Sequence, residues 1–219
     1  MKLQKLKFDR KSMLLYAVTD RAWLGAKSLS MVVREALEGG ASFIQLREKN
    51  LSFDDFLAEA NEIKEVCKEY MVPFVINDNV DVALACDADG VHLGQDDMSP
   101  IEARKILGDN KIIGLSAVNL EQAILAEKQG ADYLGVGAVF PTSTKEDADY
   151  VSYEELKKIC EAVSIPVVAI GGIGADNIME LRGSGIDGIS VVSAIFAQKN
   201  IKEATENLFK LSKEMVSSK

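Results

Sequence analysis

The sequence predicts a single-domain α/β protein with a (β/α)8 TIM barrel fold, and three observations support this prediction. Short apolar runs rich in β-branched residues recur eight times along the chain. Segments with helical periodicity separate these runs, which is the pattern of parallel strands joined by helical crossovers. Polar residues follow nearly every run. This favours a barrel, which gathers groups from all its strand ends, over a doubly wound open sheet, which binds its ligand at one switch point.

The predicted strands are apolar along their whole length, which is typical of strands buried on both faces of a parallel sheet. They are predicted over residues 14–20, 43–49, 74–79, 90–94, 112–118, 133–140, 167–173 and 188–195. The second strand is the most informative. Period-two alternation places Gln45, Arg47 and Lys49 on one face. Because guanidinium and ammonium groups bind phosphates strongly, we expect this face to border a site for an anionic ligand; the alternative is a solvated edge strand.

Helical periodicity identifies the segments between the strands. Helices are predicted most clearly over residues 53–70, 120–129, 153–162 and 201–215, with short helices over 80–86 and 175–182. Residues suited to N-terminal caps are Ser52, Ser99, Asn119 and Ser152, and residues suited to helix ends are Gly39, Gly40 and Gly130.

The composition indicates one folded domain over residues 1–219, in which residues 1–12 form a short N-terminal extension. A net charge of −9 argues against a nucleic-acid partner, because no surplus of cations is present to neutralise phosphates. No apolar stretch is long enough to cross a bilayer, so we expect no membrane partner. The three scattered cysteines fit reduced thiols. We therefore expect a cytoplasmic protein with small-molecule partners, and a homo-oligomer stays an open alternative.

In a barrel the carboxyl ends of the strands meet at one mouth, so residues far apart in the sequence become neighbours. The candidate residues there are Gln45, Arg47, Lys49, Asn77, Asp78, Asp97, Ser116, Thr142, Ser143, Thr144, Lys145, Gly172, Val192 and Ser193. Asp78 and Asp97 repel a phosphate unless a cation lies between them. One or two carboxylates with ligand phosphates are the usual way in which proteins hold Mg²⁺. The alternative is that both aspartates cap helices or pair with lysines.

Two further features carry weaker signals. Gly171, Gly172 and Gly174 precede a short predicted helix, as in the phosphate-binding loops after strands seven and eight of barrels. His92 is the only histidine of the chain. It can serve acid–base chemistry, or it can be a buried, hydrogen-bonded structural residue.

Seven motifs occur in the order and on the strands that one family shows. They are QLREK (45–49), VINDN (75–79), GVHLGQDD (90–97), GLSAVN (114–119), GAVFPTSTK (137–145), AIGGI (169–173) and VVSAI (191–195). Through them the chain closely resembles the thiamine-phosphate synthase family. The resemblance implies a barrel enzyme, a transferase that joins hydroxymethylpyrimidine diphosphate to a thiazole phosphate or its carboxylated form. It also implies release of pyrophosphate and use of Mg²⁺.

The resemblance further implies a role for each matching residue. The pyrimidine diphosphate would contact Gln45, Leu46, Arg47, Glu48, Lys49, Asn77, Ser116 and Lys145, and Mg²⁺ would be held by Asp78 and Asp97. The thiazole phosphate would contact Thr142, Ser143, Thr144, Gly172, Val192 and Ser193. The residues implied in catalysis are Arg47, Lys49, Ser116 and Lys145. Asn79 stands where the family often has an aspartate, which puts a supporting metal role there in doubt.

The predicted site suits this chemistry. Pyrophosphate can leave an electron-rich pyrimidinylmethyl carbon before the nucleophile bonds, because the ring stabilises the resulting cation. Such a step needs stabilisation of the departing charge and no strong base. Three alternatives stay open: a thiazole tautomerase-type barrel, a phosphosugar isomerase or epimerase, and a non-catalytic barrel that binds phosphate ligands. The tautomerase is expected to lack the metal and diphosphate groups, and the isomerase needs an acid–base pair.

Overall fold

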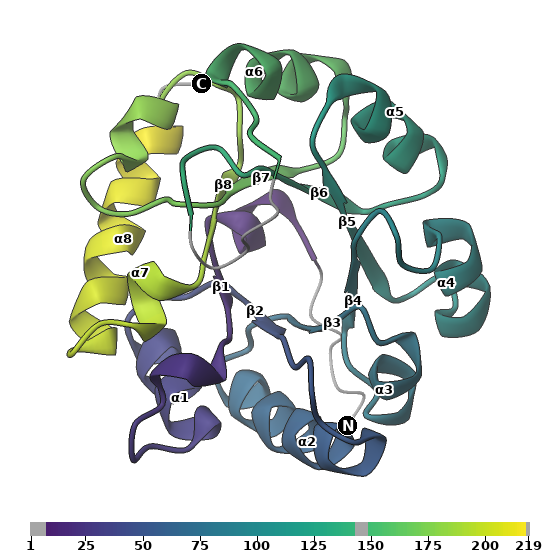
Figure 1. Cartoon of the computed structure of the whole chain (residues 1–219), viewed down its shortest axis with the longest axis vertical. Coiled ribbons are helices and arrows are strands. Elements are labelled where there is room, and N and C mark those ends of the chain that lie inside the picture. Colours follow the sequence, from purple (N-terminus) through teal and green to yellow (C-terminus); the bar gives the residue numbers. More distant parts are fainter. Residues whose placement is uncertain (1–7, 143–148, 218–219) are drawn as a thin grey trace.

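The computed structural model describes residues 8–142 and 149–217, and its parallel strands close into a barrel. The strands are β1 (Leu15–Val18), β2 (Phe43–Leu46), β3 (Phe74–Asn77), β4 (Gly90–Leu93), β5 (Ile112–Ala117), β6 (Tyr133–Val136), β7 (Val167–Ile170) and β8 (Gly188–Val191). They follow one another around the ring in sequence order, and β8 pairs with β1 (Figure 1). The predicted barrel is confirmed, because an open sheet has no such closing pair.

Helices surround the barrel. They are α1 (Leu29–Glu38), α2 (Phe53–Glu69), α3 (Val80–Ala85), α4 (Pro100–Leu107), α5 (Leu120–Lys128), α6 (Tyr153–Ala162), α7 (Ser193–Phe196) and α8 (Ile201–Val216). Of these, α2, α4, α5 and α6 begin at the predicted caps. The predicted caps Ser52, Ser99, Asn119 and Ser152 each accept a backbone N–H of the first helical turn. Within the parts of the chain that the structure describes, no helix is long and apolar enough to span a membrane.

The connection between β7 and β8 differs from the helix predicted over residues 175–182. It contains only a 3-10 helix, η3 (Ile178–Leu181), preceded by Asn177 without a side-chain capping bond. Gly183 and Gly185 follow with φ angles of 80° and 93°, which ends the helical conformation after one turn. The helix α8 packs against η3 and covers this side of the barrel.

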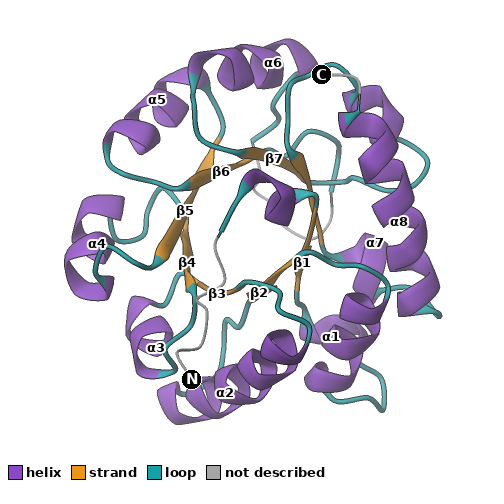
Figure 2. Ribbon diagram, turned by 180° about the vertical axis from the view of Figure 1, so that it is seen from behind, coloured by secondary structure: helices purple, strands orange, loops and turns teal. Residues whose placement is uncertain are grey.

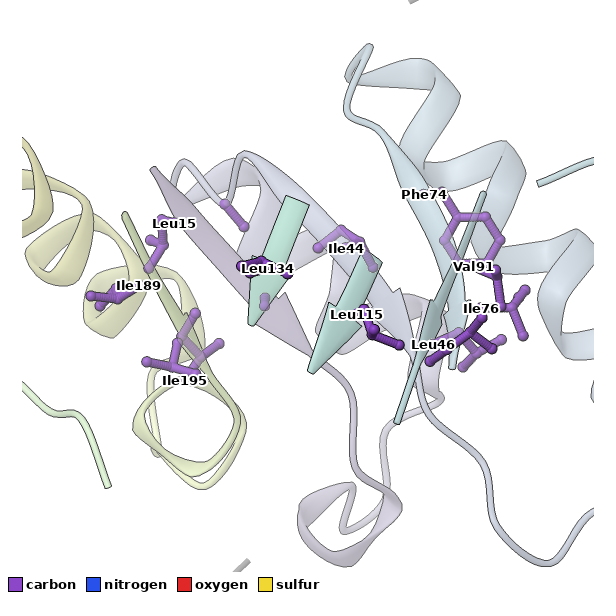
Figure 3. Packing of buried hydrophobic residues seen from close by; sticks show 14 of the residues in the cluster. Leu15, Ile44, Leu46, Phe74, Ile76, Val91, Leu115, Leu134, Ile189 and Ile195 are labelled. Atoms are coloured by element: carbon purple, nitrogen blue, oxygen red, sulfur yellow. The ribbon is translucent and has the colours of Figure 1, made fainter. Parts of the chain in front are cut away.

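Alternation along the strands divides the buried side chains into two sets. Outward-facing residues pack against the helices and form the main core, and Figure 3 shows Leu15, Ile44 and Leu134 among them. Inward-facing residues fill the barrel with a second cluster, formed by Met13, Tyr16, Val18, Phe43, Val75, Ile112, Tyr133 and Val168. The floor of the mouth is therefore packed with side chains, as in other barrels of this type.

The N-terminal segment closes the end of the barrel opposite the mouth. A short 3-10 helix, η1 (Arg10–Met13), lies across the centre of the ring, as Figure 2 shows. The Phe8 ring packs between the barrel residues Phe43 and Tyr133, with ring centroids 6.1 and 5.9 Å away. From residue 8 onwards, the predicted extension is thus part of the barrel.

The residue before each even-numbered strand caps the start of the preceding odd-numbered strand. A side-chain oxygen accepts a backbone N–H at 2.7 to 3.0 Å in four hydrogen bonds, which join Ser42 to Leu15, Asp89 to Phe74, Asp132 to Ile113 and Asp187 to Val167. Because these N–H groups would otherwise be buried without a partner, the four bonds fix the lower rim of the barrel.

Candidate active site

The loop after β2 carries the two cations that the sequence analysis singled out. The strand ends at Leu46, so the prediction of a strand over 43–49 is wrong at its end, and Arg47 and Lys49 lie in the loop. Of Gln45, Arg47 and Lys49, Gln45 alone belongs to the strand; it projects into the barrel and is 4% exposed. The Arg47 N–H donates to Thr19 Oγ1 at 3.0 Å, and its guanidinium lies 3.7 Å from Asp20. Both cations therefore stand in the loop at the rim, and the backbone of Arg47 is anchored to Thr19.

Glu48 and Leu46 direct their side chains away from the mouth. Glu48 Oε1 lies 2.8 Å from the Arg21 guanidinium, and its side chain is 5% exposed. Arg21 also pairs with Glu59 on α2. Burial, together with the adjacent Glu48, raises the pKa of Glu59 to about 7. Leu46 packs in the main core. Any contact of these two residues with a substrate is therefore limited to their backbone atoms.

Asp78 occupies a strained turn directly after β3. Its φ is 60°, and the Asn79 N–H donates to the Asn77 carbonyl at 2.7 Å, which makes a three-residue γ-turn. The Asp78 N–H donates to the His92 carbonyl on β4 at 2.8 Å. Its carboxylate accepts a hydrogen bond from Lys49 Nζ at 3.0 Å. Strained backbone of this kind clusters at functional sites.

Asp97 lies beside Asp78, in the turn after β4. Its Oδ2 accepts the Gly94 N–H at 2.7 Å. Burial, and then the neighbouring carboxyl of Asp78, raise the pKa of Asp97. Two carboxyl groups so close repel each other when both are ionised, unless a cation lies between them. The two carboxylates, with the Lys49 ammonium beside them, form a charged group at the mouth.

The donor set of this pair fits Mg²⁺. The ion is hard, prefers oxygen ligands and commonly takes one or two carboxylates, with phosphate and water completing its shell. Over residues 8–142 and 149–217, no group of three or more His, Cys, Asp or Glu residues could hold a metal by itself.

A hydrogen-bonded chain of side chains crosses the barrel beneath the mouth, linking Gln45, Tyr16, Tyr133, His92 and Ser116. Gln45 Nε2 donates to the Tyr16 hydroxyl, which lies 2.8 Å from the Tyr133 hydroxyl. The Tyr133 hydroxyl is 2.9 Å from His92 Nδ1, and His92 Nε2 is 3.1 Å from Ser116 Oγ. Burial lowers the pKa of His92 to about 4, so the imidazole is neutral near pH 7. His92 is thus buried with a hydrogen-bond partner at each ring nitrogen.

The ends of β7 and β8 form the other side of the mouth. Gly172 has a φ of 65°, and a Cβ there would lie 2.8 Å from the Cβ of Phe140. A glycine is thus already required by the close approach of the loop after β6. Val192 and Ser193 mark the turn from β8 into α7. The first N–H groups of a helix have no partner within it and are available to an anion.

The loop after β6 carries the remaining candidates. Thr142 is half-buried at the start of this loop. Ser143, Thr144 and Lys145 lie outside the described residues. The structure thus pairs Lys49 with Asp78 and sets Asp97 beside Asp78. It also joins Gln45 to Ser116 through the buried chain of hydrogen bonds.

Sequence reasoning missed Tyr133 as a site-supporting residue, and it missed Arg21 and Glu59 as the partners of Glu48. Both tyrosines of the buried chain stand in apolar strands, where a packing role is the usual interpretation. Strand alternation predicts that the Tyr133 side chain points into the barrel. Its pairing with Tyr16, across the barrel, depends on strand register, which the sequence pattern does not contain.

Comparisons with known proteins agree on one family. The family model described as thiamine monophosphate synthase matches residues 15–195. The thiamine-phosphate synthase of Ruminiclostridium cellulolyticum is 52% identical over 197 residues, which covers 90% of this chain and 94% of that protein. The thiamine-phosphate synthase of Clostridium novyi is 53% identical over 196 residues, covering 89% and 96%. The solved thiamine phosphate pyrophosphorylase of Pyrococcus furiosus superposes with a TM-score of 0.88 at 47% identity, covering 94% of this chain and 98% of that one.

Proposed function

This chain belongs to the thiamine monophosphate synthase family, and from that premise we propose how its barrel mouth joins hydroxymethylpyrimidine diphosphate to a thiazole phosphate. Relatives that are 52% and 53% identical over most of the chain are thiamine-phosphate synthases, so the chain is a transferase of thiamine biosynthesis that acts on small molecules. The products of the reaction are thiamine phosphate and pyrophosphate.

The observation that carries the proposal is the ion pair of Lys49 and Asp78 at the mouth, with Asp97 beside Asp78. The Lys49 ammonium bonds the Asp78 carboxylate at 3.0 Å, and the Asp97 carboxyl adjoins it. A diphosphate brings several negative charges, so it needs cations placed around it. Lys49 and Arg47 supply two of them from the protein itself.

Asp78 and Asp97 are the residues that would hold Mg²⁺. When bound, the ion neutralises part of the charge that develops on the departing pyrophosphate. Cationic side chains of the protein neutralise the remaining charge. Arg47 and Lys49 donate hydrogen bonds to the leaving group, and Lys145 is the third cation that we assign to it. The buried floor beneath Ser116 keeps water from the pyrimidine carbon, which protects a cationic centre from hydrolysis.

The thiazole phosphate is assigned to the opposite side of the mouth. Gly172, Val192 and Ser193 offer backbone N–H groups there, and Thr142, Ser143 and Thr144 are assigned hydroxyl contacts. A phosphomonoester suits this side because the phosphate sites of barrels commonly lie after strands seven and eight. The two phosphates are then held on opposite sides of the mouth. In this arrangement the thiazole nitrogen faces the pyrimidine carbon from the side opposite the leaving pyrophosphate.

The experiment that tests this function is an assay of pyrophosphate release with both substrates present. We expect fast release only with both substrates and Mg²⁺, and loss of activity in excess chelator. A barrel that merely binds phosphate ligands would bind both compounds without release. A tautomerase-type barrel would instead interconvert thiazole isomers, which a parallel assay of that reaction detects.

We also propose that the enzyme works in the cytoplasm. In support, Cys67 on α2 and Cys86 at the end of α3 are buried free thiols. Reduced thiols are usual in reducing compartments such as the cytosol. Fractionation of cells that express the natural protein tests this assignment.

A further inference from the structure

We propose that Tyr16, Tyr133 and His92 are positioning residues that fix the hydrogen-bonding direction of Gln45 and Ser116 at the mouth. The inference rests on the proposed function, which assigns Gln45 and Ser116 to the pyrimidine diphosphate. Tyr16 and Tyr133 are 1% and 0% exposed, so they can act on a substrate only through their neighbours.

Counting hydrogens along the chain gives it one direction. Gln45 Nε2 donates to the Tyr16 hydroxyl, so the single Tyr16 hydrogen is available to the Tyr133 hydroxyl. Tyr133 then donates its own hydrogen to His92 Nδ1. Since Nδ1 accepts, the neutral imidazole carries its hydrogen on Nε2. That hydrogen is donated to Ser116 Oγ.

This direction determines what the mouth offers a ligand. Ser116 Oγ accepts from below, so its own hydrogen is directed toward the mouth and Ser116 acts as a donor. Gln45 donates an N–H to Tyr16, so the side-chain carbonyl oxygen of Gln45 is available as an acceptor. The two ends of the chain thus present one donor and one acceptor. An aminopyrimidine carries both complementary groups, an amino N–H and a ring nitrogen lone pair.

Two glycines leave space for the rings of the hydrogen-bonded chain. Gly114 on β5 lies between His92 on β4 and Tyr133 on β6 in the strand register. A Cβ at Gly114 would overlap the Tyr133 ring, and one at Gly135 would lie 3.1 Å from His92 Cε1. Because both positions lack side chains, the two rings stack with centroids 5.4 Å apart. A buried polar chain that is fully paired in this way gives rigid, unique positions to its ends.

The direct test is the tautomer of His92 by nitrogen NMR. His92 is the only histidine, so protein labelled with ¹⁵N-histidine gives signals from this ring alone. Near neutral pH, we expect the Nε2–H tautomer, with Nδ1 as a hydrogen-bond acceptor. An Nδ1–H tautomer, or a doubly protonated ring, would overturn the direction of the chain.

The second test is a double-mutant cycle between Tyr133 and Ser116. Tyr133→Phe keeps the ring but removes both of its hydrogen bonds. We expect kcat to fall by roughly 10- to 100-fold, the size of effect that misplacement of a catalytic group produces. The KM for the thiazole phosphate should not change. In a Ser116→Ala background, Tyr133→Phe should have little further effect on kcat, because the Ser116 hydroxyl through which Tyr133 acts on the substrate is already absent.

Controls separate positioning from stability and from the proposed function itself. Tyr153→Phe removes a tyrosine hydroxyl that donates to the Arg182 carbonyl at 2.9 Å on the outer surface, and it should keep full activity. If Tyr133→Phe does not fold, Tyr16→Phe replaces it in a second cycle with Gln45→Ala, where the two losses in kcat should likewise not add. Additive losses in either cycle would contradict the positioning role. Absence of pyrophosphate release by the unmodified enzyme would instead contradict the proposed function and leave the tautomer result standing.

Discussion

Asp78 shows how single residues build the site. Its γ-turn has a φ of 60°, a conformation that costs a non-glycine residue on the order of 1–3 kcal/mol. In return, the turn aims the carboxylate at Lys49 and sets it beside Asp97. A metal and a diphosphate gain most from groups that are already in place, because no energy is then lost in arranging them.

At Asp78 and Asp97, replacement by Asn keeps the shape but removes the charge that holds Mg²⁺. We expect Asp78→Asn and Asp97→Asn each to lower kcat/KM by about 100-fold or more, since metal stabilisation of a leaving group amounts to several kcal/mol. Asp96→Asn is the matched control, because Asp96 is an exposed neighbour in the same turn. Steady-state pyrophosphate release measures all three. Near-normal rates for the two central variants would show that neither carboxylate holds the metal.

The two-subsite arrangement predicts opposite binding defects at Arg47 and Ser193. Arg47→Ala should weaken the pyrimidine diphosphate by roughly 10- to 100-fold, the worth of one hydrogen bond to a charged group, and spare the thiazole phosphate. Ser193→Ala should show the reverse pattern to a smaller extent. Gly172→Val is unsuitable here, because its side chain would strike Phe140 whether or not a ligand is bound. Calorimetric titration of each ligand measures the pattern, and equal losses in both variants argue against separate subsites.

At the scale of elements, the strands and most helices follow from local patterns, and the exceptions have local causes. The caps at Ser52, Ser99, Asn119 and Ser152 lie where the sequence predicts them, because capping needs only a short side chain before an apolar periodic segment. The end of β2 was not predictable in this way. Arg47 continues the alternation of the strand, but its N–H bonds the Thr19 side chain instead of a neighbouring strand.

The lower rim of the barrel gives an element-scale prediction about stability. Asp132 accepts the Ile113 N–H and pairs with Arg104 at 2.7 Å. Asp132→Ala leaves a buried N–H of β5 without its partner, so the free energy of unfolding should fall by about 1–3 kcal/mol. Urea denaturation measures this, with Asp109→Ala in an exposed turn as the control. Because the rim lies opposite the mouth, the folded variant should keep its kcat; a lost kcat with unchanged stability would contradict this assignment.

For the whole molecule, the barrel was predictable from the sequence, and the side-chain interactions inside it were not. Eight apolar runs with polar ends indicate the fold, and the fold alone predicts that Asp78 and Asp97 meet. The chain from Gln45 to Ser116 spans five strands, and Glu48 turns toward Arg21 instead of the ligand. Both depend on side-chain packing in three dimensions, which alternation and spacing do not encode.

Global stability should depend on pH through Glu59. Its ordinary pKa of 4.5 is raised to about 7 in the fold, so the native state binds more protons than the unfolded state between these values. The free energy of unfolding should therefore fall as pH rises from about 4.5 to about 7. Glu59→Gln should flatten this dependence, and Glu62→Gln, on the exposed face of the same helix, should not. Urea denaturation across this range measures the slope; an unchanged slope in Glu59→Gln would assign it to other groups.

The central claim, that Asp78 and Asp97 hold the metal against the diphosphate, is tested most directly by diffraction from crystals grown with Mn²⁺ and pyrophosphate. Mn²⁺ accepts the same oxygen ligands as Mg²⁺, and its anomalous scattering locates it. We predict one peak bonded to carboxylate oxygens of both aspartates and to pyrophosphate, with Arg47 and Lys49 contacting the same ligand. Pyrophosphate bound at the mouth with Mn²⁺ absent from these two aspartates, or held elsewhere, would contradict the account.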